Sequence, residues 1–156
     1  MTEDSRQATL DHIKLVRAIL GLAIDDLTNR GEIHDLSKLE EPELSVFDEF
    51  TKKLKGSTFG SPEYKQFLAE MKPALDHHYA NNRHHPEHFK DGIRGMNLLD
   101  VLEMFCDWKA ATLRHANGDI RKSIELNQER FGYSDELKQI FHNTVDWLDS
   151  SVGLLT

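Results

Sequence analysis

Apolar residues recur at intervals of three or four positions along most of the chain, the spacing that one face of an α-helix produces. The first such stretch covers residues 5–29, and Gly31 supplies a plausible stop. Its apolar stripe consists of Leu15, Val16, Ile19, Leu20, Ala23, Ile24 and Leu27. His12 precedes Leu15 by three positions and Val16 by four, so its ring should project from the face that meets the core.

The same spacing predicts further helices. A helix that begins at Pro62 continues through Phe67, Met71, Leu75 and His78. The other predicted helices cover residues 31–39, 43–54, 96–117, 119–131 and 134–150, with one more short turn from Pro86. No stretch alternates with period two, so no strand is predicted. We expect an all-α fold, a compact single-domain bundle of about six or seven helices across residues 1–156.

Composition narrows the classes of function. A chain of 156 residues has the size of one compact domain. Its net charge of -8 argues against general nucleic-acid binding and against binding to anionic membranes, since both need a cationic face. The single cysteine, Cys106, excludes an intramolecular disulfide, and we find neither a signal peptide nor an apolar run long enough to cross a bilayer. We expect a cytoplasmic protein that is not bound to a membrane.

Histidine is concentrated in one short segment. Five histidines fall within residues 77–88, in the string HHYANNRHHPEH. Outside it, His34-Asp35 supplies one imidazole and one carboxylate at adjacent positions, and Asp107 is a carboxylate in an apolar and aromatic helix. Imidazole nitrogen with carboxylate oxygen suits Mn, Fe, Co, Ni and Zn without distinguishing among them. The chain therefore predicts a transition-metal site assembled from distant segments.

Helical phase selects among the clustered histidines. His78 continues the apolar stripe of its helix, whereas His77 is rotated about 100° away from it. We therefore choose His78 over His77 as one ligand. Either His84 or His85 supplies another, and His85 is preferred because it lies just before Pro86, where an extended backbone can aim a side chain into a pocket. His84 is then expected to contact substrate or to donate a proton.

The predicted helix over residues 96–117 carries a polar face. Asp100, Glu103, Asp107 and Arg114 share it, and an ordinary solvated face explains Asp100 equally well. Asp107 lies among small and aromatic residues, where an unpaired carboxylate would be costly, so we expect it to be a metal ligand. Glu103 would then orient a ligand histidine through its other ring nitrogen, and Arg114 could hold a phosphate.

The order of these residues along the chain resembles that of the HD superfamily of metal-dependent phosphohydrolases, whose members are all-helical domains. His12, His34-Asp35 and Asp107 stand in the superfamily's order of early histidine, His-Asp pair and late aspartate. The string from His34 to Lys38 is similar to the HD-x-G-K motif of the branch that hydrolyses cyclic dinucleotides, with Ser37 in place of glycine. That branch's glycine-tyrosine-proline string is lacking, so cyclic di-GMP specificity is not implied.

The resemblance implies a ligand set and a reaction. His12, His34, Asp35 and Asp107 would be the primary metal ligands, the histidine cluster would complete a second metal position, and Lys38 would contact substrate phosphate. Asp35 would bridge two metal ions, and a hydroxide held between them would attack a phosphate ester. The expected substrate is a small anion, most simply a nucleotide or cyclic nucleotide. The chain also resembles a group of small phage and bacterial proteins with HHPEHF and CDWKAA-like strings, which would place a phage-encoded copy in the host cytoplasm.

Two alternatives stay open. Some proteins that resemble this superfamily hold a diiron pair that activates oxygen, with the same set of ligands. The other alternative is a metal-stabilised binding module without catalysis, whose closed site leaves no coordination position for water. The oligomeric state is also open, a homo-oligomer included.

Overall fold

The computed structural model describes residues 5–56, 62–114 and 118–151, and within them every regular element is helical. The prediction of an all-α fold is therefore confirmed. The chain divides into two units, Met1–His34 and Asp35–Thr156. No helix in the described part of the chain is both long enough and apolar enough to cross a membrane.

From residue 5 on, the first unit forms one helix, α1, which covers Ser5–Ile33. The helix continues through Gly31, where the sequence predicted its end, because one glycine costs an α-helix only about 1 kcal/mol. His12 is exposed on this helix, and His34 follows its last residue. Over the intervening residues an uninterrupted helix rises about 30 Å. The structure therefore does not bring His12 and His34 together, because α1 does not fold back on itself.

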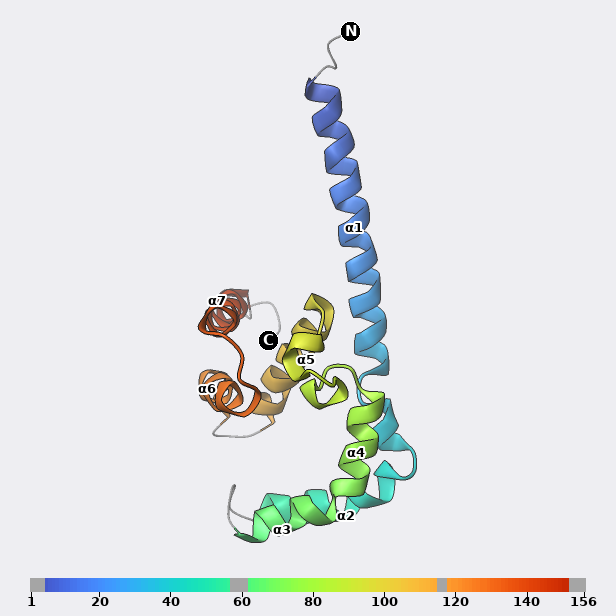
Figure 1. Ribbon diagram of the computed structural model, residues 1–156, viewed down its shortest axis with the longest axis vertical. Helices are drawn as coiled ribbons and strands as arrows, with labels where there is room; N and C mark the ends of the chain where they lie inside the picture. The colour runs from blue at the N-terminus through green and yellow to red at the C-terminus, as the bar shows by residue number, and fades with distance from the viewer. Residues whose placement is uncertain (1–4, 57–61, 115–117, 152–156) are drawn as a thin grey trace. The chain divides into compact units, whose positions relative to one another are not determined.

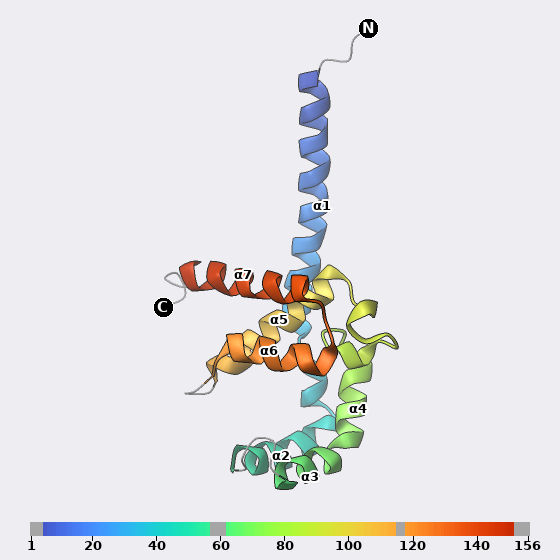
Figure 2. The same ribbon diagram turned by 60° about the vertical axis from the view of Figure 1, so that its left-hand side comes forward.

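In the described residues of the second unit there are six further α-helices. Their course can be followed in Figures 1 and 2. They are α2 Glu43–Gly56, α3 Pro62–Glu70, α4 Lys72–Asn81, α5 Leu98–Leu113, α6 Ile120–Phe131 and α7 Asp135–Ser151. The described residues also form three short 3-10 helices: η1 Leu36–Leu39 precedes α2, and η2 Pro86–His88 and η3 Gly92–Gly95 lie between α4 and α5. Helices α2, α3 and α4 pack together, and so do α5, α6 and α7.

The predicted helix from Pro62 to the histidines is divided in two. Helix α3 ends at Glu70, and α4 begins at Lys72 with Pro73 in its first turn. Proline lacks the backbone N–H that a helix interior needs, and its ring clashes with the carbonyl four residues earlier. Pro73 therefore explains why the helix is interrupted at Met71. The interruption lets the axis of α4 differ from that of α3, while the last residues of α4 keep the predicted helical phase.

The main apolar core lies between α5, α6 and α7. Phe105 and Phe141 stack with their ring centroids 5.6 Å apart and an interplanar angle of 7°. The buried members of the core are Met104, Phe105, Ile120, Ile124, Tyr133, Phe141 and Val145. Helix α5 begins at an Asn97 capping box, in which the Asn97 side chain accepts a hydrogen bond from the Asp100 backbone and the Asp100 side chain accepts one from the Asn97 backbone. This core and cap fix the direction of α5, which carries Glu103 and Asp107.

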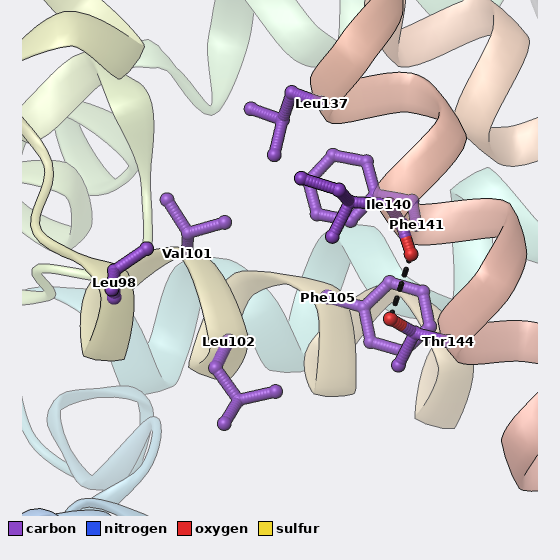
Figure 3. A pocket seen from close by; sticks show the side chains of 8 residues that line it. All are labelled: Leu98, Val101, Leu102, Phe105, Leu137, Ile140, Phe141 and Thr144. Atoms are coloured by element: carbon purple, nitrogen blue, oxygen red, sulfur yellow. Dashed lines mark hydrogen bonds between the residues drawn. The ribbon is translucent and has the colours of Figure 1, made fainter.

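A pocket of about 150 Å³ lies on α5 and α7 (Figure 3). Its wall is almost entirely apolar and is formed by Leu98, Val101, Leu102, Phe105, Leu137, Ile140, Phe141 and Thr144. The Thr144 hydroxyl donates a 2.8 Å hydrogen bond to the Ile140 carbonyl of its own helix. This pocket contains none of the histidines or carboxylates that the sequence predicts to bind metal.

Candidate metal centre

Three histidines reach the candidate site from α4 and from the loop that follows it. His78 lies one turn after the buried Ala74 on the inner face of α4, and its side chain is 1 % exposed. His84 and His85 lie in the loop between α4 and η2. His85 has an extended backbone, with φ -101° and ψ 128°, which is the conformation that a following proline favours. The helical phase of His78 and the position of His85 before Pro86 thus direct both rings to one place.

Asp35 supplies the carboxylate from the turn before η1. Its φ of 60° is the only positive φ of a non-glycine residue within the described ranges. Aspartate enters this left-handed region more easily than most residues, but the conformation still costs free energy. The turn is closed by a 2.9 Å hydrogen bond from the Lys38 backbone N–H to the Asp35 carbonyl. The strained backbone holds the Asp35 side chain among the histidine rings.

The four side chains converge at distances that suit a metal ion. Asp35, His78, His84 and His85 each offer a ligand atom, and these atoms all lie within 4.8 Å of one another. Nε2 of His78 is 2.9 Å from Nε2 of His85 and 3.3 Å from Oδ1 of Asp35. Nε2 of His84 is 3.5 Å from the same Asp35 oxygen. Ligand atoms about 2.1 Å from one ion lie about 3.0 Å apart at octahedral angles and about 3.4 Å apart at tetrahedral angles.

Two glutamates set the orientation of two of the rings. Oε2 of Glu43 lies 2.8 Å from Nδ1 of His78, and Oε1 of Glu103 lies 3.1 Å from Nδ1 of His84. An ionised carboxylate only accepts hydrogen bonds, so in each neutral ring the hydrogen belongs on Nδ1 and the lone pair on Nε2. Both lone pairs then face Oδ1 of Asp35. Imidazole nitrogens and a carboxylate oxygen aimed at one place are the ligand atoms that divalent transition metals bind, so these residues fit a metal ion.

The surroundings shift the pKa values of these groups toward metal-binding forms. Burial disfavours the charged ring and lowers the pKa of His85 to about 3, which keeps its ring neutral near neutral pH. Burial opposes ionisation of Asp35, but the hydrogen bond and positive charge of Lys38 at Oδ2 favour the ionised carboxylate and lower the pKa of Asp35 below its ordinary value. A neutral imidazole and an ionised carboxylate are the forms that bind metal.

Lys38 contacts the carboxylate of Asp35. Its Nζ is 2.6 Å from Oδ2 of Asp35, the oxygen that does not face the histidines, and 5.3 Å from the centre of the Phe47 ring. Its side chain is 35 % exposed, so the ammonium group borders both the candidate metal centre and solvent. An anionic group that approached the centre from this side would meet a positive charge.

The structure brings together most of the residues that the sequence proposes for the site. The second unit gathers Asp35, Lys38, His78, His84, His85 and Glu103 in direct contacts. A ligand oxygen of Asp107 also lies within 4.8 Å of a ligand nitrogen of His84. Arg114 is exposed at the end of α5, two turns beyond Asp107 and about 10 Å farther along the helix. His12 and His34 belong to the first unit.

The structure changes two interpretations of the sequence, one of His84 and His85 and one of Asp100. His84 and His85 do not exclude each other, because both offer a ligand atom to the same group. Asp100 does not lie on a solvated face: it is fully buried and accepts two hydrogen bonds from Arg83, at 3.1 and 3.0 Å. Arg83 immediately precedes His84, so this ion pair ties the histidine loop to the first turn of α5.

Sequence reasoning missed Glu43 and its neighbours. Glu43 is completely buried, and hydrogen bonds link its carboxylate to His77, His78 and Ser37. Burial opposes its charge, yet the contacts with His77, Ser37 and His78 lower the pKa of Glu43 below its ordinary value. A glutamate in the first turn of a helix is ordinarily a solvated residue that complements the helix dipole, so its position gave no signal.

These features define a helical protein with a candidate centre of three histidines and one aspartate. The chain belongs to the family of unknown function DUF5662, whose model matches residues 1–153. No curated protein and no solved structure matches the chain. The family match adds no link to the HD superfamily, and that resemblance stays a prediction.

Proposed function

We propose that the protein is a metal-dependent phosphohydrolase that cleaves a phosphate ester of a small anionic substrate, a nucleotide or cyclic nucleotide in the first instance. The observation that carries the proposal is the convergence of Asp35, His78, His84 and His85, with their ligand atoms within 4.8 Å of one another. The order of the His-Asp pair and Asp107, which resembles the HD superfamily, supplies the class of reaction.

In this proposal some residues bind the metal and others orient the ligands. Asp35, His78, His84 and His85 would hold a divalent transition metal, and Asp107 beside His84 offers a further carboxylate for a second ion. A bound metal would lower the pKa of a coordinated water and polarise a phosphoryl oxygen. Glu103 keeps the His84 ring oriented through its 3.1 Å contact.

Lys38 supplies the cation for the substrate. Its ammonium group already lies beside the centre, 2.6 Å from Asp35, and is partly exposed. A phosphate oxygen that entered the centre could accept a hydrogen bond from this group, since an ammonium has three donors. Positive charge fixed beside a phosphoryl group stabilises the charge that develops during its transfer. The protein's net charge of -8 makes this local cation important for an anionic substrate.

Elemental analysis joined to a phosphatase screen tests the proposal. The purified protein should contain Mn, Fe, Co, Ni or Zn and hydrolyse at least one nucleoside phosphate or cyclic nucleotide after metal is added back. Asp35→Ala should abolish both metal content and hydrolysis, whereas Asp48→Ala, which removes an exposed carboxylate on α2, should change neither. Retention of metal and activity in Asp35→Ala contradicts the proposal.

Two other outcomes also argue against hydrolysis. Tight metal binding without turnover of any phosphate ester would identify a binding module. Anaerobic loading with iron, followed by exposure to oxygen, distinguishes the oxygenase: it gives a spectral change that depends on oxygen, while a hydrolase turns over its substrate without oxygen.

A further inference from the structure

Glu43 occupies an unusual position for a carboxylate. It is the first residue of α2, and its side chain is 0 % exposed. Oε1 accepts a 2.7 Å hydrogen bond from Nδ1 of His77, and Oε2 accepts bonds from Nδ1 of His78 at 2.8 Å and from the Ser37 hydroxyl at 3.1 Å. A buried carboxylate needs several donors to offset its lost hydration, and these three supply them.

The hydrogens of the neighbouring Asn82 amide leave Nδ1 of His78 available as a donor. The Asn82 amide nitrogen lies 2.8 Å from the Ser37 hydroxyl oxygen, 2.8 Å from the His78 carbonyl and 3.0 Å from Nδ1 of His78. An amide has two hydrogens, and the two shorter contacts use them. Nδ1 of His78 is therefore not needed as an acceptor for Asn82, and it is free to donate to Glu43.

The ring of His78 is also held by packing. Phe47, one turn after Glu43 on α2, meets it edge to face with the ring centroids 5.9 Å apart. Helix α2 thus supplies both the hydrogen-bond acceptor and the apolar wall for one ring of the metal centre. His77 is 41 % exposed and takes the other oxygen of Glu43, so a solvent-facing side chain anchors a buried carboxylate.

We propose that Glu43 is a positioning residue: its carboxylate holds His78 with the hydrogen on Nδ1 and turns Nε2 toward Asp35, while His77 anchors that carboxylate from the solvent side. This proposal rests on the proposed function in one respect only: the group that His78 would bind is taken to be a divalent metal. Glu43 itself acts through His78 and does not reach the metal position. Metal affinity should respond to Glu43, because partners that orient ligand histidines contribute about 10- to 100-fold.

The first measurement uses the wild-type protein without metal. Long-range ¹H–¹⁵N NMR spectra of the histidine rings report which nitrogen carries the hydrogen. The expected result is that His78 carries it on Nδ1. A hydrogen on Nε2 of His78 overturns the proposal, whatever any variant does and whether or not the protein proves to bind metal.

The second measurement compares variants with Co(II) as the probe. Glu43→Gln removes the charge with little change of shape and should weaken Co(II) binding about 10- to 100-fold while the tautomers of His78 become mixed. The matched control is Glu49→Gln, the same substitution at an exposed site of α2, and it should bind Co(II) like the wild type. His77→Asn should keep the hydrogen on Nδ1 of His78 and weaken binding less than Glu43→Gln does.

Each result has a definite meaning. Unchanged Co(II) affinity and an unchanged His78 tautomer in Glu43→Gln contradict the positioning role. Unchanged Co(II) affinity in His77→Asn contradicts the anchoring role. A wild type that binds no Co(II) contradicts the proposed function instead, and the ring spectra still decide whether Glu43 positions His78.

Discussion

The apolar core of α5, α6 and α7 and the histidine cluster on and after α4 are both buried, but the core consists of apolar side chains and the cluster of polar or charged ones. In the core, the side chains with almost no exposure are hydrophobic, such as Phe105 at 1 % and Val145 at 0 %. In the histidine cluster, the most buried side chains are polar or charged: Glu43 at 0 %, and His78 and His84 at 1 % each. Burial stabilises the first region directly, whereas in the second it carries a cost that hydrogen bonds must offset.

The comparison suggests that different regions of the second unit provide its stability and its proposed metal binding. Packing three imidazoles and an aspartate against one another costs free energy, and a cation bound between them would offset that cost. The core can therefore be read as the part that holds the second unit together, and the histidine cluster as the part that this stability supports. The predictions below test this division, beginning with the largest effect.

Removing a core aromatic should lower stability without changing the candidate metal centre. Phe105→Ala takes away a ring that stacks on Phe141 and leaves a cavity, so the free energy of unfolding should fall by about 3 to 5 kcal/mol. Denaturant titration measures the change. Leu98→Ala, at an 85 % exposed site of the same helix, is the control and should change stability by less than about 0.5 kcal/mol. Equal effects of the two substitutions would remove the basis for calling this region the core.

Metal should stabilise the protein through the histidine cluster. At a free metal concentration of 100 times Kd, the free energy of unfolding should rise by about 2.7 kcal/mol, which is about 5 to 10 °C in Tm. Thermal unfolding with Co(II) and with a chelator measures this increment. Asp35→Ala should lose it, and Leu98→Ala should keep it. An increment that survives in Asp35→Ala would place the metal elsewhere.

The metal-free protein should lose stability as the pH falls below about 6.5. The unfolded chain binds a proton at His85 near its ordinary pKa of 6.5, whereas the folded protein does so only near pH 3. The contribution of His85 to stability is therefore complete above pH 6.5 and is lost progressively as the pH falls toward 3, with a slope of at most about 1.4 kcal/mol per pH unit. Denaturant titrations at several pH values measure the slope. If His85→Gln has the same slope as the wild type, the burial of His85 does not cause it.

The local pattern of apolar residues predicted the helical class and the orientation of one histidine of the cluster, but not every helix boundary. The period of apolar residues predicted that the fold is all-α, and the same period placed His78, and not His77, on the inner face of α4. The break before α4 was missed although Pro73 was visible in the sequence, because the apolar spacing from Phe67 to His78 continues across it. The prediction that α1 ends at Gly31 was also wrong, because the low helix propensity of one glycine was not enough to end the helix.

The sequence by itself determined the helical class. It also determined which kinds of side chain could bind a metal and the short segments that carry them, because helical periodicity and side-chain chemistry are local properties. Only the tertiary structure decided that Asp35, His78, His84 and His85 share one centre, that Asp100 pairs with Arg83, and that a buried Glu43 holds both His77 and His78. The reason is physical: a hydrogen bond or a metal-ligand distance between residues up to 50 positions apart depends on how helices pack, and packing depends on the shapes of many side chains at once.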